Sequence, residues 1–350
     1  MYFKKLIASL FLSAASLVTL SLGAPPSVKV KEVFFTTDQS RENIDSPATW
    51  HGPNGEHLLF ATSKAGHSVN VFDAVNGAMI QRIGGQGVEL GQFDRPNGVS
   101  VVDDYLLVVE RDNRRVQVLH IPDYTPLTTF GESELGKPYG LYVQALEAGE
   151  YHVYVTDNYE TPAEEIPADS ELNHRVRRYL LETEGKTAEA ELDLSFGETS
   201  GPGRLFVVES IFGDPVHNHL LIADELEHDK RGRQVKVYDL EGKFTGKTFG
   251  KGLFKYQVEG IALYQTSETD GYWFVTDQSK TLNRFLVFDR QTFEHLATLE
   301  GERTLNTDGI WITQASMPRF PHGALYTCDN DQAISAFDLA DVFQALGLAH

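Results

Sequence analysis

The sequence predicts an all-β protein, a six-bladed β-propeller with four-stranded blades and a ring closed by an N-terminal strand. Helix signals are scarce after the first two dozen residues, and short β-branched and aromatic runs alternate with clusters of Gly, Asn, Asp and Pro. One strand pattern also recurs six times at a spacing of about 50 residues, which is typical of propeller blades. Two stacked sandwiches are the alternative, but a sandwich does not predict six copies of one strand order.

Each repeat has the same order of elements. A strand that ends in a polar pair is followed by a second alternating strand, a third segment and the short inner strand of the next unit. The first of these strands recurs at 58–63, 106–111, 153–157, 220–224, 273–277 and 325–329.

Three segments depart from this order. The last unit lacks its outer strand, and Val28–Phe35 is predicted to supply it, so that no strand edge stays unpaired. The third unit holds an insertion at 158–174 that is rich in Glu and Pro, and such insertions lie in loops on one face, often the binding face. The stretch 339–348 is predicted to form a short helix.

The N-terminus has the form of a secretory signal. Lys4 and Lys5 precede an apolar run over 6–22, and small residues close it. We therefore expect a signal peptide over 1–24, a single propeller domain over 25–350 and a secreted or periplasmic protein. An uncleaved membrane anchor is the alternative; no later segment is long and apolar enough to span a membrane.

Composition excludes several function classes. The chain has 350 residues, a formal charge of −20 and one cysteine. A single cysteine excludes a disulfide framework and Cys-rich metal sites. The acidic balance argues against a nucleic acid partner, because phosphate backbones are bound by a net basic face. It suits cations, or anions bridged by cations. We expect a monomer with a small-molecule ligand.

The inner strands predict a ring of polar side chains at one mouth of the central channel. Equivalent residues of a propeller surround its axis, so the residue before each inner-strand Gly or Ser contributes to this ring. Converging carboxylates repel each other unless a cation lies between them, and oxygen ligands favour Ca²⁺. The ring residues are Asp45, Asn97, Tyr139, Glu209, Glu259 and Asp308.

A second ring is predicted at the end of the first strand of each unit. A cation cluster beside basic side chains suits a multiply charged anion such as phosphate. The alternative is that the Asp residues which end these strands, among them Asp277, cap turns. The predicted second ring comprises Lys64, Arg111, Asp157, Asp224 with Glu225, Gln278, and Asp329 with Asn330 and Asp331.

Two family resemblances follow from these motifs. Gly91–Val99 looks like the repeat signature of NHL-type propellers, which indicates fold. Five segments occur in the order found in the β-propeller phytases, which are secreted, acidic, six-bladed and calcium-dependent. These segments are Asp45–Trp50, Thr62–Lys64, Val258–Tyr264, Thr276–Gln278 and Thr307–Ile310.

The resemblance to phytases implies roles for individual residues. Glu209 and Glu225 would orient the attacking water, while Lys64, Arg111 and Tyr139 would contact substrate phosphate. Tyr139 would also join the calcium ligands or their waters, and Asp329 and Asn330 fall near the final acidic cluster of the family. The implied calcium ligands are Asp45, Glu209, Glu225, Glu259, Gln278, Asp308, Asp329 and Asn330.

The chain also departs from the family. Val258 precedes Glu259 where the family often has another acidic residue, and the Lys-Glu pair of the third blade has no counterpart in Thr156–Tyr159. We expect a calcium-dependent phosphomonoesterase that binds several Ca²⁺ ions and acts on phytate or a related phosphorylated compound. The alternatives are a non-catalytic propeller that binds a periplasmic ligand or protein, and a lactonase or lyase with one axial Ca²⁺.

Overall fold

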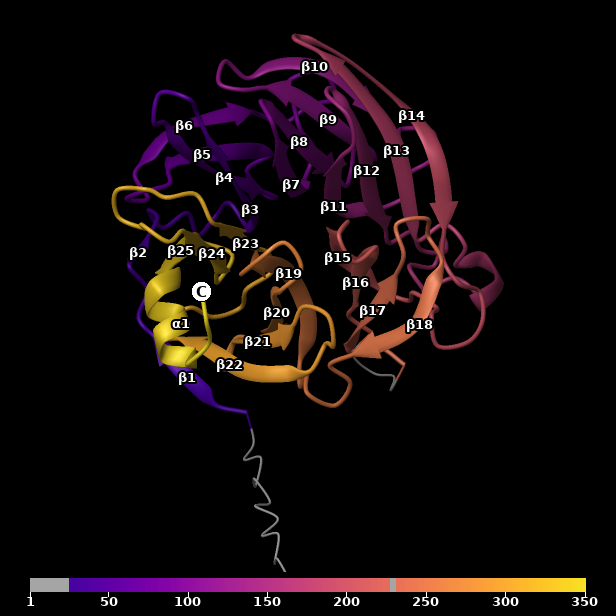
Figure 1. Cartoon of the computed structure of the whole chain (residues 1–350). Helices are drawn as coiled ribbons and strands as arrows, with labels where there is room; N and C mark the ends of the chain where they lie inside the picture. Colours follow the sequence, from indigo (N-terminus) through magenta and orange to yellow (C-terminus); the bar gives the residue numbers. More distant parts are fainter. Residues whose placement is uncertain (1–24, 227–230) are drawn as a thin grey trace, which may run out of the picture.

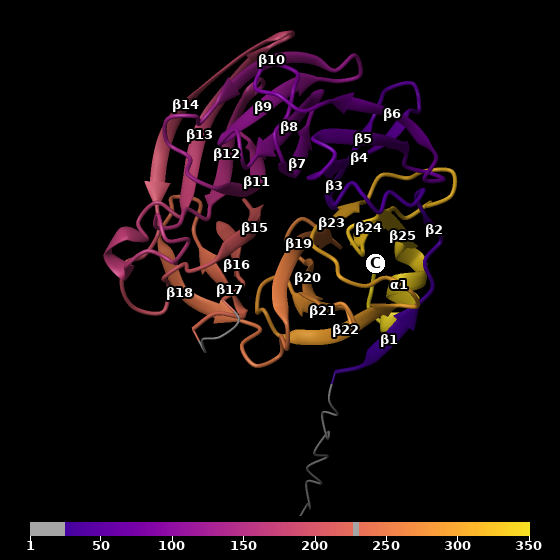
Figure 2. The same ribbon diagram turned by 180° about the vertical axis from the view of Figure 1, so that it is seen from behind.

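The computed structural model confirms the six-bladed propeller (Figures 1 and 2). It describes residues 25–226 and 231–350, so the predicted signal peptide over 1–24 lies outside the described residues. Six sheets surround a central axis. Apart from the strands that the N-terminal segment adds at the outer edge, each sheet is antiparallel and its first strand along the chain lies innermost. In the described residues no helix has the length and apolar character that crossing a membrane would require.

The blades follow one another along the chain. Blade 1 comprises β3 (Ile44–His51), β4 (His57–Ser63), β5 (Ser68–Asp73) and β6 (Met79–Gly84); blade 2 comprises β7 (Pro96–Val102), β8 (Tyr105–Glu110), β9 (Arg115–His120) and β10 (Thr125–Phe130). Blade 3 comprises β11 (Pro138–Ala145), β12 (Glu150–Asp157), β13 (Val176–Glu184) and β14 (Thr187–Phe196); blade 4 comprises β15 (Val208–Asp214), β16 (His219–Asp224), β17 (Gln234–Tyr238) and β18 (Phe244–Phe249). Blade 5 comprises β19 (Gln257–Gln265), β20 (Gly271–Gln278), β21 (Arg284–Asp289) and β22 (His295–Gly301); blade 6 begins with β23 (Ile310–Thr313), β24 (Ala324–Asp329) and β25 (Ala333–Asp338).

The N-terminal segment closes the ring, but not as the one strand that the sequence predicted. β1 (Ser27–Val30) pairs in parallel with β22 and adds a fifth strand to blade 5, whereas β2 (Phe34–Phe35) pairs antiparallel with β25 and completes blade 6. Glu32 lies between them. Its buried carboxylate accepts the backbone N–H groups of Arg303 and Thr304 at 2.9 and 2.8 Å, and these bonds hold the chain where it crosses from one blade to the next.

The core consists of side chains that neighbouring blades bury between them. Between blades 4 and 5, for example, Val235, Phe249, Trp273 and Phe288 form part of one buried cluster. The predicted C-terminal helix is confirmed as α1 (Leu339–Leu346). Its buried residues, including Val342 and Phe343, pack against the side chains of blades 5 and 6.

Neighbouring inner strands contact one another closely, and at four of the contact points a glycine leaves no room for a Cβ. A Cβ on Gly140 would lie 2.2 Å from the backbone oxygen of Glu209, and one on Gly309 would lie 2.8 Å from that of Asp45. The backbone N–H of Gly309 also donates to the Asp45 oxygen at 3.0 Å. Each ring residue precedes such a contact, so the backbone of the neighbouring blade fixes its position.

Candidate metal and anion site

The predicted ring of inner-strand residues surrounds a narrow cavity at one end of the central channel. The cavity has a volume of about 30 Å³. Its lining comes from blades 1, 3, 4, 5 and 6, although these residues are far apart in the sequence. The side chains that line it are Asp45, Ser46, Tyr139, Glu209, Ser210, Glu259 and Asp308, together with Gly140 and Gly309.

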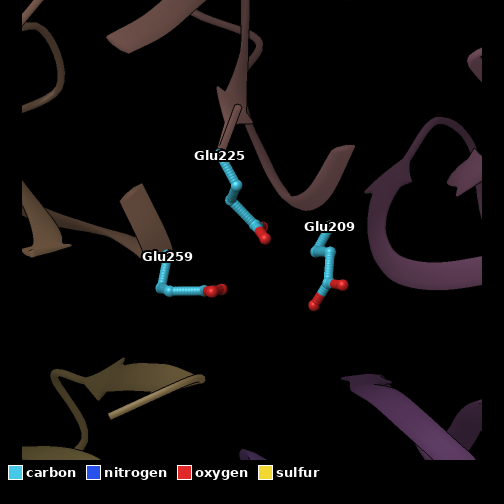
Figure 3. A group of neighbouring side chains, drawn as sticks. All are labelled: Glu209, Glu225 and Glu259. Carbon is cyan, nitrogen blue, oxygen red and sulfur yellow. The ribbon is translucent and has the colours of Figure 1, made fainter. Parts of the chain in front are cut away.

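Three glutamates form the acidic centre of this site. Glu209 lies on β15, Glu225 follows β16 directly and Glu259 lies on β19. One carboxylate oxygen from each lies within 4.8 Å of the others, and Figure 3 shows the three side chains pointing toward a common space. No other group of three or more His, Cys, Asp or Glu side chains in residues 25–226 and 231–350 is placed to hold a metal ion.

Burial and mutual repulsion raise the pKa of these carboxyl groups. Removal from water raises the pKa of Glu209 to about 7, although Lys64 acts in the opposite direction. Burial and then the nearby charge of Glu209 place the pKa values of Glu225 and Glu259 well above the ordinary range. Burial also raises the pKa of Asp308. The folded chain holds these carboxylates together at a cost that a bound cation would offset.

Several buried polar atoms of the site lack a hydrogen-bond partner among the described residues. They are Oε1 of Glu225, Oδ2 of Asp308, and both Nδ2 and Oδ1 of Asn97. Buried polar groups in folded proteins are nearly always paired. The unpaired carboxylate oxygens of Glu225 and Asp308 fit a hard cation such as Ca²⁺, which accepts six to eight oxygen ligands in flexible geometry.

The two ring aspartates, Asp45 and Asp308, each have a polar partner. Lys64 Nζ lies 2.6 Å from Asp45 Oδ1, and Gln278 Nε2 donates to Asp308 Oδ1 at 2.7 Å. Burial opposes the charge of Lys64, but the carboxylates of Asp45, Asp308 and Glu209 raise its pKa above the ordinary value. The Lys64 ammonium therefore stays charged beside the acidic cluster.

The aspartates at the ends of β12, β16, β20 and β24 cap loops, as the alternative interpretation of the second ring predicted. Asp157 accepts the N–H groups of Gly136 and Lys137 at 3.0 and 2.7 Å. Asp224 likewise accepts from Phe206, Asp277 from Tyr256 and Asp329 from Leu305. The Asn330 side chain is exposed, and neither it nor Asp329 belongs to the group of three glutamates.

The residues of the second ring that reach the site lie one position after the residues equivalent to these capping aspartates. Lys64 and Glu225 directly follow β4 and β16, and Gln278 follows Asp277 as the last residue of β20. Each of the three interacts with the acidic ring electrostatically or through a hydrogen bond. Asn158 occupies the same position in blade 3 and is buried. The sequence interpretation missed Asn158, although the register of Glu225 after Asp224 could have identified it.

Basic side chains gather on the opposite side of the site, in blades 2 and 3. Arg111 forms an ion pair with Asp112 at 2.7 Å and acts electrostatically on the Tyr139 hydroxyl. Burial and the charge of Glu209 raise the pKa of Tyr139 to about 12, so its hydroxyl stays protonated. The charges of Lys137 and Arg95 both act on the Glu209 carboxyl. The site thus has an acidic and a basic side.

Comparisons with known proteins support the fold alone. No protein-family model matches the chain, and no curated protein matches it. Hydrazine synthase from Kuenenia stuttgartiensis is a structural neighbour at 13% identity and a TM-score of 0.52, over 92% of this chain and 84% of that one. A chain of a nidogen/laminin complex matches at 15% identity and a TM-score of 0.53, over 82% and 90%. At such identities the similarity establishes that this chain folds as a propeller like theirs.

Proposed function

We propose that the protein is a secreted, calcium-dependent phosphomonoesterase that hydrolyses phytate (inositol hexakisphosphate) or a related phosphorylated compound. The observation that carries this proposal is the juxtaposition of a buried carboxylate cluster with basic side chains around one cavity. Glu209, Glu225 and Glu259 converge there, and Lys64 reaches Asp45 from the other side. The five segments that resemble β-propeller phytases contribute Asp45, Lys64, Glu259, Gln278 and Asp308 to the same place.

The acidic residues would hold divalent cations. A bound Ca²⁺ would neutralise phosphate charge and lower the pKa of a water, as metal ions do in hydrolytic sites. The unpartnered atoms of Glu225 and Asp308 support the assignment of this role to these residues. The proposed ligands are Asp45, Glu209, Glu225, Glu259, Gln278 and Asp308.

The basic side would bind the substrate phosphate. The Lys64 ammonium and the Arg111 guanidinium would contact phosphate oxygens, and the Tyr139 hydroxyl would donate a hydrogen bond. Glu209 or Glu225 would orient the water that attacks phosphorus. The water oxygen joins phosphorus as the ester P–O bond breaks, and the leaving alcohol takes a proton. No covalent enzyme intermediate is required.

The direct test is phosphate release from phytate by the purified protein, with calcium and after chelation. We expect release that depends on calcium and returns when calcium is restored. Absence of calcium-dependent release between about pH 5 and pH 9, with phytate and with simple phosphomonoesters, would refute the proposal.

Metal content separates the remaining alternatives. Several calcium ions per chain favour the phosphomonoesterase, one axial ion favours a lactonase, and none favours a binding propeller. The apolar part of the channel is lined by Leu141, Phe212 and Trp311 rather than by the glutamates. The apolar and acidic cavities share Ser46, Gly140, Ser210 and Gly309, so metal content rather than cavity geometry decides between these functions.

A further inference from the structure

A second, larger cavity lies beside the ring, between the loops of blades 2 and 3. Its volume is about 720 Å³. It adjoins the ring at Arg111, which lines this cavity and acts electrostatically on Tyr139 in the lining of the other one. Basic and acidic side chains line it in equal number. They are Arg111, Arg114 and Lys137 on one hand, and Asp112, Glu160 and Glu164 on the other.

Glu160, from the acidic insertion, forms an ion pair with Lys137. Of the three basic residues of this cavity, Lys137 lies closest in sequence to a ring residue, Tyr139. Glu160 Oε1 lies 2.6 Å from Lys137 Nζ, and each side chain is less than a third exposed. Lys137 is itself fixed, because its backbone N–H donates to Asp157 Oδ1 at 2.7 Å. The pair is therefore built into the loops that border the site.

The residue before Glu160 is anchored to the core. The guanidinium of Arg175 lies 4.5 Å from the centre of the Tyr159 ring, and Arg175 Nη1 donates to the Tyr159 backbone oxygen at 2.6 Å. Arg175 is fully buried and also donates to the backbone oxygen of Phe206. The Tyr159 hydroxyl donates to the backbone oxygen of Glu171 further along the insertion. The backbone next to Glu160 is therefore held in place by these contacts of Tyr159.

We infer that Glu160 takes the place of a substrate anion at Lys137, and that it restricts the protein to esters without a second phosphate in this cavity. The inference rests on the proposed function for the reaction itself. A second phosphate would have to displace Glu160 from Lys137 and would then face the carboxylates of Asp112 and Glu164. Like charges in one cavity disfavour such binding. Glu160 is in this sense a specificity-determining residue, and it disfavours substrates that would place a second phosphate in this cavity.

The test measures binding separately from hydrolysis. Calorimetric titration of the calcium-free protein with inositol hexakisphosphate and with inositol monophosphate compares Glu160→Gln with the wild type. We expect the variant to bind the hexakisphosphate about fivefold more tightly, which is the scale of one exposed ion pair, and the monophosphate unchanged. Glu165→Gln is the matched control, because Glu165 is an exposed carboxylate of the same insertion with no ion pair in the described residues. Addition of Lys137→Ala to Glu160→Gln should abolish the gain.

Each outcome decides the inference. Equal effects of Glu160→Gln and Glu165→Gln, or an unchanged affinity for the hexakisphosphate, would overturn it. With calcium present, the ratio of kcat/KM for hexakisphosphate over monophosphate should rise about fivefold in Glu160→Gln. If the wild type hydrolyses neither compound, the proposed function fails, and the calorimetric comparison still decides the role of Glu160.

Discussion

One repeat position carries opposite charge on the two sides of the site. Directly after the second strand of the blade, blade 4 places Glu225 beside Glu209 and Glu259, whereas blades 1 and 2 place Lys64 and Arg111 at the equivalent position. The fold thus provides equivalent positions, and the residue at each position determines the chemistry. A repeat protein that is acidic overall can in this way form a basic region next to an acidic one.

The two sides also differ in how well their charges are satisfied. On the basic side, Arg111 pairs with Asp112, and Lys137 pairs with Glu160. On the acidic side, a buried oxygen of Glu225 has no partner among the described residues, and burial raises the pKa of the whole group. The charges of the basic side are paired within the protein, while the acidic side would be completed by a cation. The following predictions test this difference.

The largest effect is expected from Glu259→Gln. The change keeps the shape of the side chain but removes one of the three converging charges, so calcium-dependent phosphate release should fall by at least about 100-fold. Steady-state kinetics with saturating calcium measures this loss. Glu189→Gln makes the same chemical change on the exposed outer strand β14 and should retain full activity. Similar activities for the two variants would place the reaction elsewhere.

Lys64→Met should weaken substrate binding and strengthen calcium binding. Without the ammonium beside Asp45, the substrate loses a phosphate contact, so KM should rise by about tenfold. Calcium affinity should rise instead, because a positive charge next to the cation site is gone. Kinetics and calcium titration of the same preparation measure both quantities. A loss of calcium affinity would show that Lys64 supports the metal site rather than the substrate.

Glu225→Gln should stabilise the calcium-free protein. Burial raises the pKa of Glu225, so folding without a cation costs free energy that a neutral glutamine avoids. The free energy of unfolding should therefore rise by about 1–2 kcal/mol in the presence of chelator. The stabilisation that added calcium gives should shrink in the same variant. Denaturant titrations with and without calcium measure both changes. A destabilised variant in chelator would mean that the Glu225 charge is already compensated.

The smallest effect concerns pH. Glu209 has its pKa raised from 4.5 to about 7, so its contribution to stability is present below about pH 4.5 and is lost as the pH rises through about 7. In chelator, the wild type should therefore lose stability relative to Glu209→Gln over this interval. With calcium the difference should reverse, because the metal binds the ionised carboxylate. Equal pH dependence of the two proteins in chelator would contradict the assignment.

Much of the fold was predictable because its signals are local and repeated. The six strand units and the C-terminal helix follow from alternation and turn residues. The division of the predicted strand Val28–Phe35 into β1 and β2 was not predictable, because it depends on backbone groups of Arg303 and Thr304 that bind Glu32. Local sequence contains no signal for a contact between residues so far apart.

The site was predictable to a similar degree. Symmetry of the repeat placed Asp45, Tyr139, Glu209, Glu259 and Asp308 around one cavity. The roles in the second ring were harder to predict, because two polar residues that are adjacent at the end of a strand point in different directions. Asp224 caps a loop, while Glu225, one residue later, enters the acidic group. Only the register of the folded strands assigns these two roles.

Calcium titration of the purified protein tests the central claim most directly. The acidic side of the ring, as described, predicts saturable heats of calcium binding in the wild type. It also predicts their loss when Glu209, Glu225 and Glu259 are all replaced by glutamine, with the fold retained. Absence of binding by the wild type, or undiminished binding by the triple variant, would contradict the claim that these carboxylates form a cation site.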